Sequence, residues 1–199
     1  MFPMDKRLSK KLSALDPRFR KKINELFYSM HESISLLYEA ATHDEKTGLY
    51  NNKFFESVFE MEIEKAKRGQ QKLSLVIIDI DYFKKTNDKY GHIKSDKLLK
   101  KLAEVIKNHV RKSDVVARFG GEEFIVLLPE TSIEKAKKFC LRLKKSIHSD
   151  NIFKKHSITV SGGITQFKGE RDSGEKMKQR ADKALYQAKN TGRDRFDFM

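Results

Sequence analysis

The stretch Arg118-Phe119-Gly120-Gly121-Glu122-Glu123-Phe124 decides the fold. Residues 114–117 before it and 124–129 after it are rich in the β-branched and apolar side chains of strands. Because paired glycines permit a tight reversal with positive φ, the stretch predicts a β-hairpin with two carboxylates at its tip. Taken alone, a Glu-Glu pair on a turn is typical of a solvated loop, so its meaning depends on a second group of acids upstream.

That second group ends a buried strand. Residues 73–80 form a continuous apolar run, which is typical of a central strand covered on both faces. Asp79 and Asp81 stand at its C-terminal end, two residues apart and therefore on one face. If the hairpin tip lies beside this end, four carboxylates form a hard-oxygen cluster that a divalent cation must neutralise. Such a cluster indicates phosphoryl or nucleotidyl transfer.

A long amphipathic helix is expected before the domain. Asp16-Pro17 is typical of a helix start. Apolar residues then recur in steps of about 3.67, an eleven-residue repeat, at Phe19, Ile23, Leu26, Met30, Ile34, Leu37 and Ala41. The stripe must be covered, either by the domain or by a second copy of the chain, and we favour a parallel two-helix stalk. We therefore expect a helical dimerisation segment at 1–42 and a catalytic domain at 43–199.

The order of the remaining elements predicts an α/β fold with helices on a mixed sheet. Helices are expected at 51–68, 96–110, 132–148 and 177–190, and further strands at the hairpin and at 158–167. Residues 81–95 are expected to form a polar loop. The pair Gly162-Gly163 predicts a bulge or a close backbone approach.

Composition narrows the class of protein. The net charge of +14 comes mainly from lysines spread among acids along helical stretches, which favours a solvated surface over a nucleic-acid site and is compatible with a polyanionic small substrate. The longest apolar run, 73–78, is too short to cross a bilayer, and the N-terminus lacks a signal-peptide pattern. The single Cys140 excludes an internal disulfide and a cysteine metal site. We expect a cytoplasmic protein without a nucleic-acid partner or membrane insertion.

Several motifs, in order from about residue 43 to the C-terminus, resemble the GGDEF family of diguanylate cyclases. The run Asp79-Ile80-Asp81-x-Phe83-Lys84-x-x-Asn87-Asp88-x-Tyr90-Gly91-His92, followed by Asp96, is similar to a signature of that family. Residues 118–124 match the motif that names it, in its Glu variant. Residues 181–193 resemble its C-terminal motif, and residues 47–51 resemble its N-terminal turn.

The resemblance implies a palm-like mixed sheet flanked by helices, as in nucleotidyl cyclases. It also implies condensation of two GTP into cyclic di-GMP and two pyrophosphates, by a homodimer whose half-sites each hold one GTP. The implied metal is Mg²⁺, with Mn²⁺ as an alternative, on Asp79, the Ile80 carbonyl, Glu122 and, assisting, Glu123. The implied catalytic residues are Glu122, which would help to deprotonate the 3′-hydroxyl, with Asp79 and Glu123. The implied substrate contacts are Phe83, Lys84, Asn87, His92, Asp96, Gly120, Gly121, Lys189 and Arg193, of which Asn87 and Asp96 would read guanine.

A further short motif concerns regulation. Arg111 and Asp114 resemble the RxxD inhibitory site of the family, where product binds and holds two domains apart; the alternative is a surface salt bridge. A partner cation on the opposing domain is not evident, and Lys65 and Arg68 are candidates. Ser95 stands where the family usually has Gly. The next residue, Asp96, is the family's guanine-reading carboxylate, and its presence predicts a preference for guanine.

Three alternatives stay open beside an active cyclase. They are a non-catalytic cyclic di-GMP receptor that uses Arg111 and Asp114, another nucleotidyl cyclase or polymerase palm, and a basic nucleic-acid-binding module. The retained carboxylates of Asp79, Glu122 and Glu123 favour the enzyme.

Overall fold

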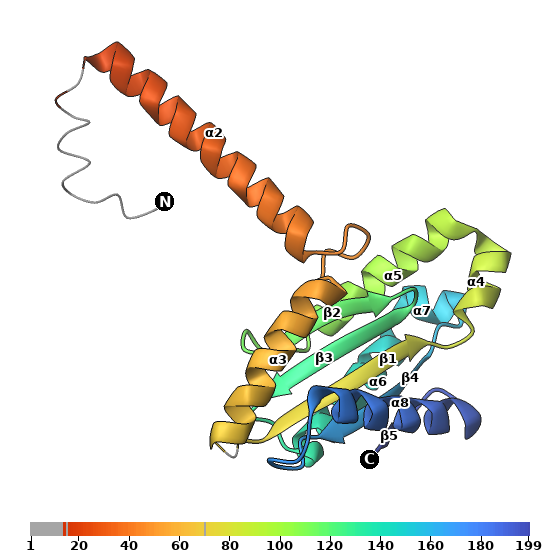
Figure 1. Cartoon of the computed structure of the whole chain (residues 1–199). Coiled ribbons are helices and arrows are strands. Elements are labelled where there is room, and N and C mark those ends of the chain that lie inside the picture. Colours follow the sequence, from red (N-terminus) through yellow and green to blue (C-terminus); the bar gives the residue numbers. More distant parts are fainter. Residues whose placement is uncertain (1–13, 15, 70) are drawn as a thin grey trace. The chain divides into compact units, whose positions relative to one another are not determined.

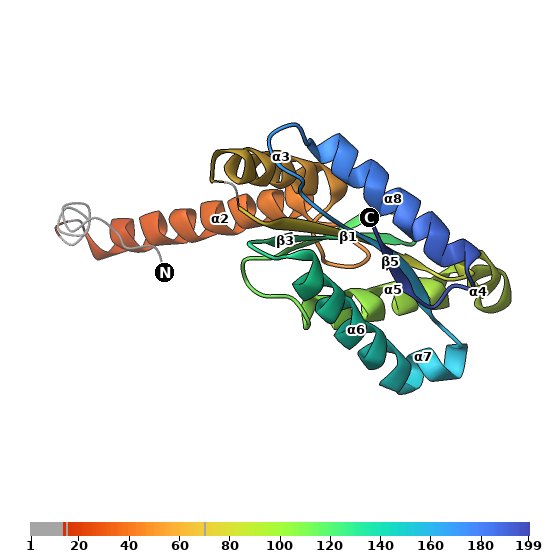
Figure 2. The same ribbon diagram turned by 90° about the horizontal axis from the view of Figure 1, so that it is seen from below.

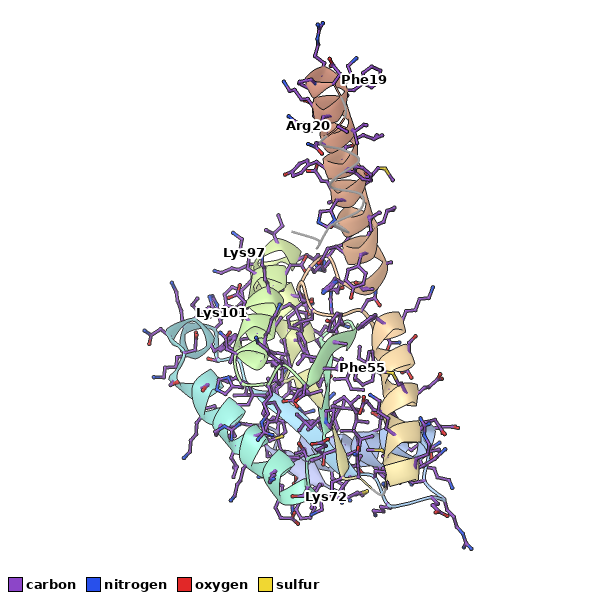
Figure 3. The ribbon with its side chains drawn as sticks, turned by 90° about the vertical axis from the view of Figure 1, so that its left-hand side faces the viewer. Phe19, Arg20, Phe55, Lys72, Lys97 and Lys101 are labelled. Atoms are coloured by element: carbon purple, nitrogen blue, oxygen red, sulfur yellow. The ribbon has the colours of Figure 1, made fainter. Side chains whose placement is uncertain are left out.

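The computed structural model describes residues 14, 16–69 and 71–199. The chain divides into two units, residues 1–41 and residues 42–199. Nearly all of the described part of the first unit belongs to helix α2 (Pro17–Thr42), whose last residue is the first of the second unit. The helix begins where the sequence predicts, because Asp16 Oδ1 accepts from the Arg18 N–H at 2.8 Å. Most of the predicted apolar stripe is exposed on this helix, including Phe19, which Figure 3 labels. The start of the expected 1–42 segment lies outside the described residues.

The second unit is built on a five-stranded mixed sheet in the order β2-β3-β1-β4-β5 (Figure 1). The strands are β1 (Leu73–Ile80), β2 (Val115–Gly120), β3 (Glu123–Pro129), β4 (Val160–Gln166) and β5 (Phe196–Phe198). β1 pairs antiparallel with both β3 and β4, and β4 pairs parallel with β5. All eight residues of β1 are buried, which confirms the prediction of a central strand.

Helices cover both faces of this sheet (Figure 2). One face is covered by α3 (Asn52–Gly69) and α8 (Gly174–Asn190), and the other by α5 (His92–Lys107) and α6 (Ile133–Ser149), beside the short α7 (Asn151–His156). Side chains alternate along β1: Ile77 belongs to the core with α3 and Phe55, whereas Ile78 belongs to the core with α5 and α6. The predicted α/β class is thereby confirmed.

Three short elements differ from the sequence prediction. Residues 83–90, expected in a loop, form helix α4 (Phe83–Tyr90), and α5 starts at His92 rather than at residue 96. Only Phe83 and Thr86 of α4 are buried, so its apolar pattern is too short to detect. Gly91, with φ 77°, separates the two helices. α7 and β5 were also not predicted.

The glycine pair in β4 is a site of close approach rather than a bulge. The register between β1 and β4 runs without a shift from residue 74 to residue 80. A Cβ added at Gly163 would lie 1.9 Å from the Ala181 carbonyl oxygen. Gly163 therefore lets α8 lie directly on the sheet, and this places the C-terminal end of α8 near the end of β1.

Candidate active site

The hairpin tip and the end of β1 meet, as the sequence predicted. β1 and β3 pair so that Asp79 lies opposite Glu123. The turn between β2 and β3 carries Glu122, and the β2–β3 register shifts between Arg118 and Gly120. Carboxylates from two strands and one turn are therefore brought to one edge of the sheet.

Burial and mutual repulsion mark these carboxylates as a site that requires positive charge. Burial raises the pKa of Asp79, and the nearby Glu122 adds to the rise, while the Lys189 ammonium opposes it. Lys189 Nζ lies 2.8 Å from Asp79 Oδ2. Burial also raises the pKa of Glu123, and the Asp79 carboxylate raises it further. Lys189 lowers the pKa of both Asp79 and Glu123, but burial and the neighbouring acids outweigh its effect.

Asp81 lies close enough to Asp79 for its charge to add to the raised pKa of Asp79, but its own oxygens are taken up by hydrogen bonds, which corrects the prediction of four carboxylates open to one cation. Its Oδ2 accepts from Thr159 Oγ1 at 2.7 Å and from the Asp194 backbone N–H at 3.0 Å, and its Oδ1 accepts from Ser161 Oγ at 2.7 Å. Because donors from β4, from the residue before β4 and from the loop before β5 occupy this buried carboxylate, its role is to hold these three segments together. Two residues along an ideal strand share a face, but β1 ends at Ile80.

Arg118 holds the hairpin tip in place by hydrogen bonds to the Gly121 carbonyl and to Asp44. Its Nε and Nη2 donate to the Gly121 carbonyl oxygen at 3.0 and 2.7 Å. Its Nη1 donates to both oxygens of Asp44 at 3.2 Å, and Asp44 Oδ1 also accepts from the N–H and hydroxyl of Thr47. The turn at residues 43–50 and the glycine turn are therefore parts of one hydrogen-bonded unit.

The residues expected to contact the triphosphate lie around the same edge of the sheet. Phe83 is buried at the first position of α4 and Lys84, next to it, is exposed. Arg193, with φ 61°, donates to the Tyr82 hydroxyl at 3.2 Å, and its guanidinium lies 4.4 Å from the centroid of the Tyr82 ring. The sequence reasoning assigned Tyr82 no role, although its neighbours were singled out.

The residues expected to read guanine lie on the two helices that follow β1. Asn87 is in the last turn of α4, and its carbonyl accepts from the Gly91 N–H at 2.8 Å. His92 is exposed at the start of α5. Asp96, one turn further on, accepts from Lys46 Nζ through both carboxylate oxygens at 3.0 Å. Lys46 was missed from the sequence because 50 residues separate the two partners.

Asp182 on α8 is a further acid near the site that the sequence did not single out. Burial raises the pKa of Asp182, and its charge contributes to the raised pKa of Glu123. The residue lies inside the C-terminal motif at 181–193, so the motif was the signal that could have found it.

The donor chemistry of the edge fits a hard divalent cation. Within the described part of the chain, no three His, Cys, Asp or Glu side chains converge as a ready-made metal site. The oxygens of Asp79, Glu122 and Glu123 are nevertheless of the type that Mg²⁺ and Mn²⁺ prefer. Burial first, and then the neighbouring acids, raise the pKa of Asp79 and of Glu123, and a cation bound between them would favour their charged forms.

Comparison with known proteins identifies the family. A family model described as "Diguanylate cyclase, GGDEF domain" matches residues 41–195. The chain belongs to the GGDEF family. Diguanylate cyclase DgcP of Pseudomonas aeruginosa is 41% identical over 172 residues, which cover 85% of this chain and 26% of DgcP. Diguanylate cyclase A of Treponema denticola is 40% identical over 167 residues, 81% of this chain and 45% of that protein. The chain thus spans less than half the length of these two relatives.

Solved GGDEF structures share the fold. The coiled coil and GGDEF domain of DgcB from Caulobacter crescentus, in complex with c-di-GMP, superposes with a TM-score of 0.81 at 28% identity and covers 92% of this chain and 97% of that one. The active GGEEF domain of a Vibrio cholerae diguanylate cyclase gives a TM-score of 0.71 at 32% identity, over 74% of this chain and 96% of that one. The GGDEF fold predicted from the motifs is confirmed, and among the described residues no helix is long and apolar enough to span a membrane.

The GGDEF domain also carries the short motif that suggested regulation. Arg111 donates its backbone N–H to Asp114 Oδ2 at 2.7 Å, and burial raises the pKa of Asp114. Both residues line two adjacent hollows of about 280 and 180 Å³. The smaller hollow adds the cations Lys135, Lys138 and Arg142, which sequence reasoning missed. Of the candidate partner cations, Lys65 pairs with Glu62 at 2.6 Å, and Arg68 Nε donates to the Glu64 carbonyl at 3.3 Å.

Proposed function

We propose that this chain is a diguanylate cyclase, which condenses two GTP into cyclic di-GMP and releases two pyrophosphates. The observation that carries the proposal is the register of β1 and β3, which sets Asp79 opposite Glu123 beside Glu122. Relatives that are named diguanylate cyclases support it. The retained acids also favour an enzyme over a receptor that only binds.

A divalent cation, Mg²⁺ or alternatively Mn²⁺, would be held by Asp79, the Ile80 carbonyl, Glu122 and Glu123. When bound, such an ion neutralises phosphate charge and makes a hydroxyl more acidic. The carboxylate of Glu122 would accept the proton of the attacking 3′-hydroxyl. Because the reaction joins two nucleotides, one GTP must be presented to another in the correct orientation, and most of the rate enhancement comes from that positioning.

The other predicted substrate contacts divide between the two ends of GTP. Lys84, Lys189 and Arg193 would balance the charge of the triphosphate, with Phe83 and the backbone of Gly120 and Gly121 shaping the space beside it. Asn87 and Asp96 would read the base, since a carboxylate can accept from the N1–H and the exocyclic amine of guanine together. His92 would contact the same nucleotide from the start of α5.

We propose that the active form is a homodimer whose first contact is α2. Four side chains of the apolar stripe are each at least 60% exposed, namely Phe19, Leu26, Ile34 and Leu37. Burying such a stripe against another apolar surface is favourable in water. A parallel pair of these helices buries the stripe and brings two half-sites face to face. The apolar residues of the stripe recur about every 3.67 residues, and this period favours a right-handed supercoil of the two helices. The cytoplasmic location stays a prediction.

Product inhibition is proposed at Arg111 and Asp114. The two hollows that these residues share are rich in cations, as a site for a dianionic nucleotide requires. The same observation favours the second candidate function, a cyclic di-GMP receptor. In an active cyclase, Arg111→Ala should keep the initial rate and abolish the slowing that added cyclic di-GMP causes in the parent chain.

The experiment that tests the proposed function is identification of the product. The full chain is incubated with Mg²⁺ and GTP, ATP or an equal mixture, and nucleotides are separated by chromatography. We expect cyclic di-GMP from GTP alone and from the mixture. A mixed or adenine-containing cyclic dinucleotide would indicate another nucleotidyl cyclase. Tight binding of cyclic di-GMP by a folded chain that makes no product would indicate a receptor.

A further inference from the structure

The carboxylate expected to read guanine already has a cationic partner. Lys46 Nζ lies 3.0 Å from both oxygens of Asp96. Lys46 comes from the turn at residues 43–50 and Asp96 from the second turn of α5, so the contact joins two separate elements of the domain. An ammonium has three donors, and two suffice for this contact.

The turn that carries Lys46 is held firmly in place. Asp44 and Thr47, two residues before and one residue after Lys46, are hydrogen-bonded to each other. Asp44 is also bonded to Arg118, which holds the glycine turn of the hairpin. The backbone of Lys46 is therefore fixed relative to the site, and only its side chain has freedom.

We propose that Lys46 is a specificity-determining residue that donates a hydrogen bond to O6 of the guanine read by Asp96. This inference rests on the proposed function, because it takes Asp96 as the base-reading carboxylate. Guanine presents O6, N1–H and the exocyclic amine side by side on one edge. In the chain without a ligand, Nζ lies 3.0 Å from both oxygens of Asp96, where N1–H and the amine would bind. When guanine takes that place, the ammonium is displaced sideways along the base edge, and the acceptor next to N1 on that edge is O6.

The exposure of the pair suits this role. The side chains of Lys46 and Asp96 are 52% and 37% exposed, and an ion pair so open to water contributes little to stability. The ammonium can therefore move toward a ligand at little cost, while the negative charge of Asp96 keeps it at the base. Adenine offers an amino group in place of O6, and two donors facing each other would leave both unpaired.

The test compares dissociation constants for three nucleotides. GTP is the reference, 6-thio-GTP replaces the O6 acceptor with sulfur, a poorer acceptor, and ITP keeps O6 but lacks the amine. Binding is measured by calorimetry with full chains that carry Glu122→Gln, so that turnover does not consume the ligand, and below neutral pH, so that N1 of the thio-analogue keeps its proton. Lys46→Met and Lys46→Arg are compared with the chain that has Lys46.

We expect the chain with Lys46 to bind 6-thio-GTP about tenfold more weakly than GTP, as loss of a hydrogen bond to a charged donor implies. Lys46→Met should bind both within about twofold and Lys46→Arg should restore the difference. The weaker binding of ITP should be equal in all three chains, because the amine contacts Asp96 and not Lys46.

Several results would overturn the inference while leaving the proposed function intact. One is an unchanged preference for GTP over 6-thio-GTP in Lys46→Met. Another is tighter binding of all three nucleotides by Lys46→Met, which would make Lys46 a competitor for Asp96. Failure of any nucleotide to bind a folded chain would overturn both proposals, and the absence of cyclic di-GMP synthesis with selective GTP binding would overturn the proposed function alone.

Discussion

Asp79 lies in β1 and Asp81 just beyond its end, two residues away, yet substitution by asparagine should affect activity at the first position and stability at the second. Asp81 accepts three hydrogen bonds, from Thr159, Ser161 and the Asp194 backbone. Bonds to a charged acceptor are roughly 1 kcal/mol stronger than neutral ones, so Asp81→Asn should lower the free energy of unfolding by about 3 kcal/mol. Asp79→Asn removes a repelling charge and leaves Lys189 with access to water, so that free energy should change by less than about 1 kcal/mol.

Urea unfolding measures these free energies, and cyclic di-GMP synthesis at low temperature measures activity. We expect Asp79→Asn to have nearly the same midpoint of urea unfolding as the parent and to make no product. Asp81→Asn should unfold at a lower urea concentration and, where it is still folded, make product at a reduced rate. The reasoning would be refuted if Asp81→Asn were as stable as the parent, or if Asp79→Asn lost as much stability as Asp81→Asn.

Three further predictions concern the support of the site. Burial alone would raise the pKa of Asp172, but Arg180 and two backbone N–H groups outweigh it and lower that pKa. The contribution of Asp172 to the free energy of unfolding is therefore present above about pH 4 and is lost as pH falls through the folded pKa. Asp172→Asn should cost about 3 kcal/mol at pH 7 and make the free energy of unfolding from urea titrations less dependent on pH in the acid range. Gly163→Ala places a Cβ 1.9 Å from the Ala181 carbonyl oxygen, and should lower both the thermal midpoint and the activity because α8 carries Lys189; an unchanged midpoint would contradict the close approach. Ile34→Lys should shift sedimentation from dimer toward monomer and lower the specific activity at low protein concentration, and full activity as a monomer would remove α2 from the account.

The elements with long, regular apolar patterns could be predicted from the sequence. β1 was predicted at its observed bounds and α2 at its observed start, because a continuous buried run and a capped amphipathic stripe are local signals. The meeting of Asp79 and Glu123 followed from a central strand next to a hairpin. Resemblance to the GGDEF motifs supplied roles for the individual residues, which the pattern alone did not.

What the sequence could not reveal depends on partners far along the chain. Asp81 resembles Asp79 in sequence, and only donors far along the chain, such as Ser161, 80 residues away, distinguish a structural acid from one available to a ligand. The pairing of Lys46 with Asp96 is of the same kind. β5 has three residues and exists because β4 offers it an edge. Tertiary contacts decide such features, so local propensity cannot.

The central claim is tested most directly by chromatography of the products formed from GTP and Mg²⁺ by the parent chain and by Glu122→Gln at equal concentration. Glu122 is on the turn and not in the core, so the variant should match the parent in circular dichroism and in sedimentation. We expect cyclic di-GMP and pyrophosphate from the parent and neither from Glu122→Gln. Equal product from both chains, or no product from a folded and dimeric parent, would contradict it.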